Sequence, residues 1–202
     1  MSFPGDHSAC CDSHQRPTDV LKAEHRVIER VLDALERMSE SGRIDHDLWL
    51  KAIDFLRNFA DGCHHAKEED ALFPRLERAG VPRAGGPVGC MLDEHTRGRA
   101  LIARMVGGLD AAAAGDAGAA RAVCEAAAAY IALLREHIWK EDNILFAMAD
   151  RVLDAGEQGA LRDEFDRTER SEANAGRHER YVRVADELVR ATAAGQPARS
   201  VR

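Results

Sequence analysis

The chain has 202 residues, a formal net charge of −7 at pH 7 and 45% hydrophobic residues. This length is enough for one domain with a sizeable hydrophobic core, and the negative charge argues against a broad nucleic-acid-binding surface. The first 19 residues contain neither a basic start nor an apolar run, and no window approaches the ~20 apolar residues that a membrane span needs. The five cysteines are scattered. We therefore expect a cytoplasmic protein without a disulfide framework, with neither nucleic acid nor membrane as a partner.

Residues 1–17 are polar, and we expect them to form a disordered N-terminal tail. Within this tail, His7, Cys10, Cys11 and His14 offer donors for a soft metal site. Two adjacent cysteines, however, do not match the C-x-x-C spacing of common zinc sites. A tail with incidental cysteines is therefore the favoured interpretation.

Two helices are predicted in the first part of the chain after the tail. The first begins at Thr18 or Asp19, runs to about residue 40 and carries His25 within its apolar row. The second carries His64 and Glu68, which are four residues apart. This spacing places both side chains on the same helical face.

Two further helices repeat this pattern. The third begins at a proline, which suits a first helical turn, and carries His95 on its apolar side. The fourth carries His137 and Glu141, again four residues apart on one face. The segment around this pair repeats the segment around His64 and Glu68, in a register set by a lysine, an acidic pair and a Leu-Phe dipeptide.

A glycine separates a fifth predicted helix, from about residue 158 to 192, and residues 194–202 are expected to be disordered. No strand-like alternation of useful length occurs, so the predicted fold class is all-α. We expect residues 18–155 to form an antiparallel up-down-up-down four-helix bundle. Residues 156–193 are expected to form one additional C-terminal helix packed on that bundle.

The histidines and glutamates of the four helices form one predicted constellation. In an antiparallel bundle the apolar rows converge on one core, where imidazole and carboxylate groups are costly to bury unless something satisfies them. Four imidazoles and two carboxylates suit Fe, Mn, Zn or Co, and six ligands exceed the four of a structural zinc site. They suit two metals about 3.5–4 Å apart with both glutamates bridging, and iron is favoured if the site is redox active. The predicted metal ligands are His25, His64, Glu68, His95, His137 and Glu141.

The order of these motifs resembles the hemerythrin-like (HHE cation-binding) family over roughly residues 19–153. The resemblance is carried by AEH at 23–25, KEED followed by LFP within 67–74, DEH at 93–95, and KEDN followed by LF within 140–146. It implies a four-helix bundle around a non-haem di-iron centre. Two non-haem iron ions are therefore the expected cofactor, with Zn or Mn as alternatives in their place.

The sequence departs from the oxygen-carrying members of that family. Those members have a fifth ligand histidine one turn from the third-helix ligand, whereas Met91 and Arg99 stand on the neighbouring turns here. A set of four histidines and two glutamates is more similar to di-iron proteins linked to nitrosative stress and iron–sulfur cluster repair. Those proteins usually carry a cysteine-bearing N-terminal segment, which Cys10 and Cys11 match poorly, and Ala147 replaces the proline expected after the second Leu-Phe.

His65 directly follows His64 and is turned from it by about 100° around an α-helix. We therefore expect His65 to lie beside the site without binding the metal. A competing register that pairs His65 with Glu69 is disfavoured because it breaks the alignment with the second motif.

Other polar residues near the motifs have expected supporting roles. Glu69 and Asp142 are expected at the rim, where each can accept a hydrogen bond from a ligand histidine. Tyr130 shares the face of the second motif, and core packing with a hydrogen-bonded hydroxyl is favoured over a position near the metals. Glu24 and Glu94, each just before a histidine, are expected to be solvated.

The expected function is binding of metal and of a small diatomic ligand, O2 or NO, at an exchangeable di-iron site. Such a protein would serve oxygen or nitric-oxide sensing, iron handling or a stress response, with O2, NO or peroxide as its small-molecule partner. The alternative is a di-iron enzyme or repair factor that acts on NO or peroxide or donates iron to damaged iron–sulfur clusters, so enzymatic activity is left open. A structural zinc bundle is a weaker third interpretation, and the extra helix leaves a homodimer as an option.

Overall fold

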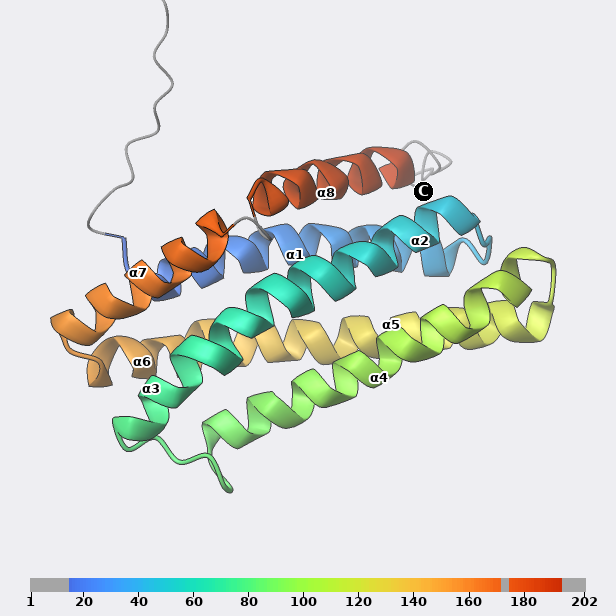
Figure 1. Ribbon diagram of the computed structural model, residues 1–202. Coiled ribbons are helices and arrows are strands. Elements are labelled where there is room, and N and C mark those ends of the chain that lie inside the picture. Colours follow the sequence, from blue (N-terminus) through green and yellow to red (C-terminus); the bar gives the residue numbers. More distant parts are fainter. Residues whose placement is uncertain (1–14, 172–174, 194–202) are drawn as a thin grey trace, which may run out of the picture.

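A computed structural model describes residues 15–171 and 175–193 of the chain (Figure 1). All regular structure in these ranges is helical, which confirms the all-α fold class, and it forms six continuous segments. The helices are α1 (Pro17–Glu40), α2 (His46–Phe55), α3 (Phe73–Arg78), α4 (Pro87–Ala113), α5 (Ala117–Lys140), α6 (Phe146–Val152), α7 (Ala155–Arg170) and α8 (Arg177–Ala193). Three π-helical stretches, η1 (Leu56–His65), η2 (Glu68–Leu72) and η3 (Glu141–Leu145), lie where α2 continues into α3 and α5 into α6.

Side chains at the helix starts explain where several segments begin. Asp45, Asp116 and Asp154 precede α2, α5 and α7, and each carboxylate accepts a hydrogen bond from a backbone N–H of the first turn. At the start of α1, the Asp19 carboxylate accepts the backbone N–H three residues earlier at 3.1 Å. Pro17 is the first residue of α1, because its ring holds φ near the helical value.

The predicted tails fall largely outside the described residues. Residues 1–14, with the candidate soft metal ligands among them, and residues 194–202 are not part of the description. The first helix begins at Pro17, just before Thr18 or Asp19, where the sequence predicted its start.

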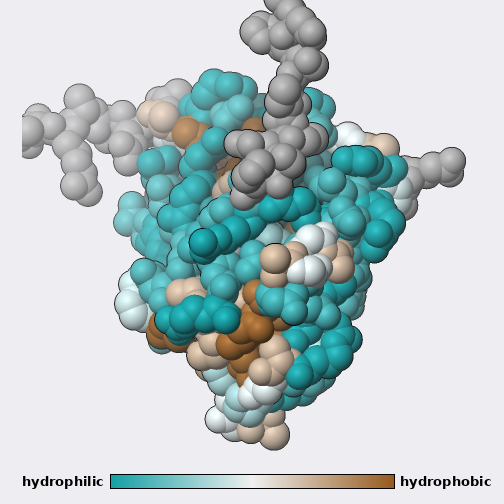
Figure 2. Space-filling model, turned by 90° about the vertical axis from the view of Figure 1, so that its left-hand side faces the viewer, coloured by the Kyte–Doolittle hydropathy of each residue, from teal (hydrophilic) through white to brown (hydrophobic). Residues whose placement is uncertain are grey.

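Four of the six segments, α1, α2–α3, α4 and α5–α6, lie side by side along the long direction of the molecule (Figure 1). α4 packs against α5, and α5 packs against α1. α8 lies on α1 and α2, whereas α7 contacts α1 and η2. The face at the end where α6 and α7 lie is mostly hydrophilic, and its hydrophobic residues lie in several places, mainly in the lower part of the view (Figure 2).

The C-terminal region contains two helices, so the prediction of one additional helix was wrong. Ser171, which follows α7, has an extended backbone (ψ 148°), and Gly176, just before α8, has a positive φ of 71°. Neither conformation continues an α-helix, and the positive φ is the kind that glycine adopts readily. The two helices consequently pack on different elements, η2 for α7 and α2 for α8.

The continuous helix from residue 117 to 152 is long and apolar enough, by length and composition alone, to cross a membrane. The prediction that no window approaches such a span was therefore wrong, because an alanine-rich stretch raises the hydropathy of this helix. The core helix of a soluble protein meets the same criterion. In this helix Tyr130, Leu134 and Phe146 are buried inside the protein.

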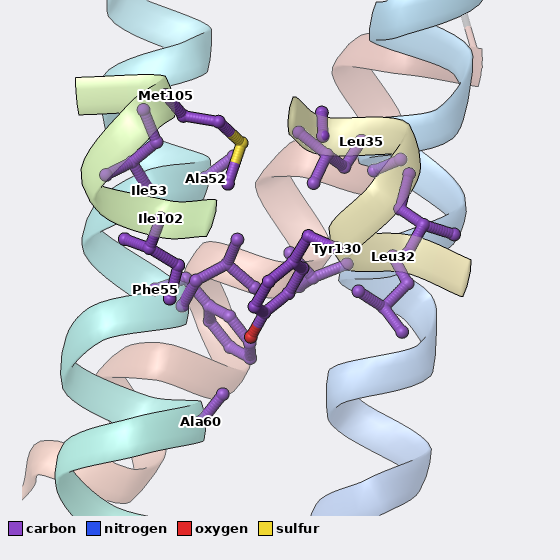
Figure 3. Packing of buried hydrophobic residues seen from close by; sticks show 14 of the residues in the cluster. Leu32, Leu35, Ala52, Ile53, Phe55, Ala60, Ile102, Met105 and Tyr130 are labelled. Atoms are coloured by element: carbon purple, nitrogen blue, oxygen red, sulfur yellow. The ribbon is translucent and has the colours of Figure 1, made fainter. Parts of the chain in front are cut away.

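Two hydrophobic clusters lie along the four long segments, one on each side of a polar layer. The first, here called the Tyr130 cluster, is partly shown in Figure 3 and includes Ile28, Phe59, Ile102, Tyr130 and Leu134. The second, here called the Phe146 cluster, includes Leu21, Leu72, Met91 and Phe146. Each long segment contributes to both clusters, and the histidines and glutamates predicted as ligands lie at or next to the turns where one cluster gives way to the other.

Candidate metal centre

The polar layer brings together all six predicted ligands, and each of them is almost completely buried. Potential donor atoms in the layer form two groups, within each of which they lie within 4.8 Å of one another. The first group is His25, His64, Glu68 and Glu141, and the second group is His65, Glu68, His95 and His137. Glu68 belongs to both groups, which therefore share a carboxylate.

Glu141 also connects the two groups. Its Oε2 atom is 3.3 Å from Nε2 of His25, in the first group, and 3.2 Å from Nε2 of His137, in the second. The carboxylate therefore lies between histidines from α1 and α5, as a ligand that bridges two metal ions would.

Glu68 occupies the corresponding position between the other two predicted histidines. Its Oε1 atom is 3.5 Å from Nε2 of His64, and its Oε2 atom is 3.6 Å from Nε2 of His95. One oxygen thus faces each group. Within the second group, the Nε2 atoms of His95 and His137 are 3.1 Å apart.

Several inward-facing atoms of the layer are buried and have no hydrogen-bond partner within the described residues. They are the Nε2 atoms of His25, His64 and His65 and both carboxylate oxygens of Glu68 and Glu141. A buried polar atom without a partner costs about 1–3 kcal/mol, and a charged one costs more. Cations between these atoms would satisfy imidazole and carboxylate lone pairs together, so the residues fit a metal centre.

His65 belongs to this layer, which corrects the expectation that it lies beside the site. Its residue surface is only 4% exposed, and its ring stacks on His95 with centroids 3.8 Å apart. The separation of about 100° from His64 holds for an α-helix, whereas these two residues end a π-helical stretch. A π turn closes over one more residue than an α turn, so adjacent side chains diverge less. The signal in the sequence was the pair of consecutive histidines.

Each of the five histidines turns its Nδ1 atom outward, toward a carboxylate. The pairs are His25–Asp142 (2.8 Å), His64–Glu24 (3.0 Å), His65–Asp61 (3.3 Å), His95–Glu69 (2.7 Å) and His137–Glu94 (3.0 Å). A carboxylate beside Nδ1 accepts a hydrogen bond from the Nδ1–H group, which leaves the Nε2 lone pair of a neutral imidazole directed into the layer. This is the orientation that a metal-binding histidine needs.

The sequence anticipated some of these outer carboxylates and missed others. Glu69 and Asp142 lie against histidines at the rim, where they were expected. The prediction that Glu24 and Glu94 are solvated was wrong, since their residue surfaces are 1% and 8% exposed. Asp61 was not singled out, although it precedes His65 by four residues and so shares its helical face.

Basic side chains surround the outer carboxylates. Arg26 contacts Asp142, Lys67 contacts Glu24, Lys140 contacts Glu94, and Arg99 contacts both Asp61 and Glu69. With neutral histidines, the two inner and five outer carboxylates face four cations, which leaves an excess of three negative charges over these residues. Two divalent cations would more than balance that excess.

The pKa values show how these residues share protons. Burial opposes charge on His137, but the Glu141 and Glu94 carboxylates together outweigh it and raise the pKa of His137 to about 9. Burial lowers the pKa of His64 to about 4, and the nearby His25 acts in the same direction. Burial, and then repulsion from Glu141, raise the pKa of Glu68 well above its ordinary value. An incoming cation would therefore displace protons from the layer.

A third cluster of donor residues, Glu24, Glu169 and His178, lies outside the layer. The Lys67 ammonium group contacts Glu24 at 2.6 Å and also contacts Glu169. Lys67 thus already supplies the positive charge that this cluster needs. The cluster supports the Glu24 carboxylate behind His64, and it is not a second candidate for a metal ion.

Tyr130 is buried in the hydrophobic cluster that bears its name. The hydroxyl was expected to be hydrogen-bonded, and Oη has no partner in the part of the chain that the structure describes. Burial, and the charge on Asp61, raise the pKa of this phenol.

Comparison with known proteins identifies the family of the chain. The uncharacterized proteins Mb2018 of Mycobacterium bovis and Rv1995 of Mycobacterium tuberculosis are each 29% identical to the chain over 175 residues, which cover 84% of this chain and 68% of each relative. No solved structure matches the chain at a significant level. The family model of the hemerythrin HHE cation-binding domain matches residues 16–149, which include every residue of the two donor groups. The chain therefore belongs to the hemerythrin HHE cation-binding domain family.

Proposed function

We propose that this protein is a non-haem di-iron protein that binds a small diatomic ligand, O2 or NO, in sensing, iron handling or a stress response. The observation that carries the proposal is the pair of donor groups that share Glu68 and are also connected by Glu141. Membership of the hemerythrin HHE family supports metal binding, and such domains typically hold iron. Zinc or manganese in the same positions is the competing assignment.

The proposal includes an antiparallel up-down-up-down four-helix bundle. Along α1 and α4 the chain runs from the Phe146 cluster, at Leu21 and Met91, to the Tyr130 cluster, at Ile28 and Ile102. Along α2–α3 and α5–α6 it runs from the Tyr130 cluster to the Phe146 cluster. Four consecutive segments with alternating directions are the topology of such a bundle, with its ligand residues facing inward.

Iron held by these residues would be able to transfer electrons to O2 or to bind NO directly. Five imidazoles and two carboxylates provide fewer bonds than two six-coordinate ions require, so positions remain for a small ligand. The protein's own contribution is to orient the imidazoles through their outer carboxylates.

Aromatic side chains shield the layer from water. The ring of Phe146 stacks on His25 with centroids 5.5 Å apart, and the ring of Phe73 stacks on His95 at 5.9 Å. Both phenylalanines come from the Leu-Phe dipeptides that follow the two His-x-x-x-Glu motifs. A dry surrounding of this kind strengthens electrostatic interactions at the site.

The alternative of an enzyme or repair factor rested on a set of four histidines. His65 adds a fifth imidazole from η1 rather than from α4, so the four-histidine comparison no longer separates this chain from ligand-binding relatives. Reversible ligand binding is therefore the function we favour. Turnover of added NO or peroxide by the purified protein would support the alternative instead.

The proposal is tested by measuring iron in the full chain after iron-replete expression and purification without a metal-chelating tag. We expect two irons per chain and near-ultraviolet absorption that changes when the anaerobic protein meets O2 or NO. Glu141→Gln should lower the iron content, whereas Glu125→Gln, at an exposed position on α5, should leave it at two. A wild-type protein with no more than one metal per chain would overturn the proposal.

A further inference from the structure

The hydroxyl of Tyr130 is a buried polar group that the described residues leave unsatisfied. The residue is 1% exposed, and its Oη atom has no hydrogen-bond partner among them. Burying a hydroxyl without a partner is unfavourable, and phenylalanine would fill nearly the same space without this cost. The chain's other tyrosine, Tyr181, behaves differently, because its hydroxyl donates to Asp54 Oδ2 at 3.0 Å.

The phenol lies about one helical turn from the histidine layer. Figure 3 shows the ring reaching across the core with its oxygen toward the level of Ala60, which comes four residues before His64. On α4, a Cβ atom added to Gly98 would lie 3.5 Å from Cε2 of the ring. Gly98 comes three residues after His95. At ~1.5 Å per residue, three residues correspond to about 4.5 Å along the helix, so the ring edge lies within one helical turn of His95.

The layer itself offers acceptors and lacks donors. Its inward atoms are imidazole Nε2 lone pairs and carboxylate oxygens, all of which would be directed at cations. A ligand with an acceptor atom would therefore find no hydrogen bond from these groups. The buried phenol keeps its proton at neutral pH, since burial and the charge on Asp61 raise its pKa.

We infer that Tyr130 is a positioning residue whose hydroxyl donates a hydrogen bond to the small ligand held in the metal layer. This inference rests on the proposed function and adds the chemical class of the ligand. That class is a molecule of two or three atoms with an exposed acceptor atom, for which azide is the probe. The hydrogen bond would favour such ligands over molecules of the same size that are poor hydrogen-bond acceptors.

The first test uses metal-free protein and needs no bound ligand. Tyr130→Phe is compared with Tyr181→Phe, both in the full chain. Tyr130→Phe should melt at the same temperature as wild type or higher, because it removes an unsatisfied hydroxyl. Tyr181→Phe should melt lower, because it removes a bonded one. A clear loss of thermal stability in Tyr130→Phe would show that this hydroxyl already has a structural partner and would overturn the inference.

The second test uses iron-loaded protein and azide. Tyr130→Phe should keep two irons per chain and bind azide about tenfold more weakly, as expected for the loss of one hydrogen bond to a charged acceptor. The infrared band of bound azide should shift in D2O in wild type and in Tyr181→Phe, and should not shift in Tyr130→Phe. If Tyr130→Phe binds azide as tightly as wild type and its azide band still shifts in D2O, the inference about Tyr130 is overturned, while the proposed function is unaffected. A wild-type protein that binds no iron would overturn the proposed function and this inference with it.

Discussion

The ring of His65 stacks on the ring of His95, with centroids 3.8 Å apart and planes 12° apart. The two histidines come from η1 and α4, and their Nδ1 atoms face Asp61 and Glu69. The Arg99 guanidinium contacts each of these carboxylates at 2.7 Å. One cation therefore holds two histidine–carboxylate pairs together, so the second donor group is organised from outside by a single side chain.

His65 is expected to be needed for full metal occupancy. His65→Gln removes an imidazole from the second group, and we expect the iron content to fall from two per chain toward one. Elemental analysis of purified protein measures this directly. His46→Gln is the matched control, because His46 is a surface residue that contacts Asp110 far from the layer in sequence, and its iron content should stay at two. An iron content of two per chain in His65→Gln would contradict the assignment of His65 as a metal ligand.

Arg99 is expected to tune metal affinity without binding the metal. Arg99→Met leaves two carboxylates without their shared cation, which loosens the orientation of two histidines. Outer partners of metal ligands affect affinity by about 10–100-fold, and we expect about tenfold faster iron loss to a chelator. Arg97→Met, on the same helix, removes only an exposed contact with Asp93 and should have no effect. Equal rates of iron loss in the two variants would show that the contacts of Arg99 with Asp61 and Glu69 do not affect metal binding.

Glu24 is expected to matter for both affinity and stability. Its carboxylate accepts from His64 at 3.0 Å and from Lys67 at 2.6 Å, so Glu24→Gln removes the buried carboxylate from the Lys67 ammonium group and leaves it only the half-exposed Glu169. Breaking a buried pair in this way costs about 3–5 kcal/mol, which denaturant unfolding can measure. Metal affinity should fall about 10–100-fold. Glu29→Gln, at a half-exposed position of α1, should change neither quantity.

The metal-free protein is expected to lose stability as the pH rises from 6.5 to 9. The pKa of His137 is raised from 6.5 to about 9 in the folded chain, so the folded state holds a proton that the unfolded state releases in this range. Stability from this group is thus fully present below pH 6.5 and lost as the pH passes 9. The raised pKa of Glu68 acts in the same direction.

Melting temperatures of metal-free protein across this range provide the measurement. In His137→Gln the decline should be shallower, since the glutamine does not titrate. If the melting temperature of the wild-type protein rises between pH 6.5 and 9, the folded state does not hold the extra proton that is assigned here to His137.

Metal affinity is expected to show the opposite pH dependence. A cation that binds His137 must displace its proton, so affinity should increase up to about tenfold per pH unit below pH 9. Zn²⁺ titrations at several pH values test this without oxidation chemistry. Affinity that is independent of pH would mean that the metal binds elsewhere.

Local rules of sequence were sufficient for the fold class and for six of the seven inward side chains. The spacing of His64 from Glu68 and of His137 from Glu141 reflects helical geometry, and an ion-binding pair on an apolar face is visible without a structure. The same reasoning places Glu69 on the rim. These predictions succeeded because they depend only on residues within a few turns of one another.

What the sequence by itself determined was therefore which positions share a helical face, and only the tertiary structure decided what stands opposite each face. His65 entered the layer because η1 is π-helical, and Glu24 became buried because it meets Lys67 and His64 from another segment. The C-terminal chain divided into two helices at Gly176. The burial of Glu24 depends on contacts between segments distant in sequence, whereas η1 and Gly176 depart locally from the α-helical repeat. Helical periodicity carries no information about either.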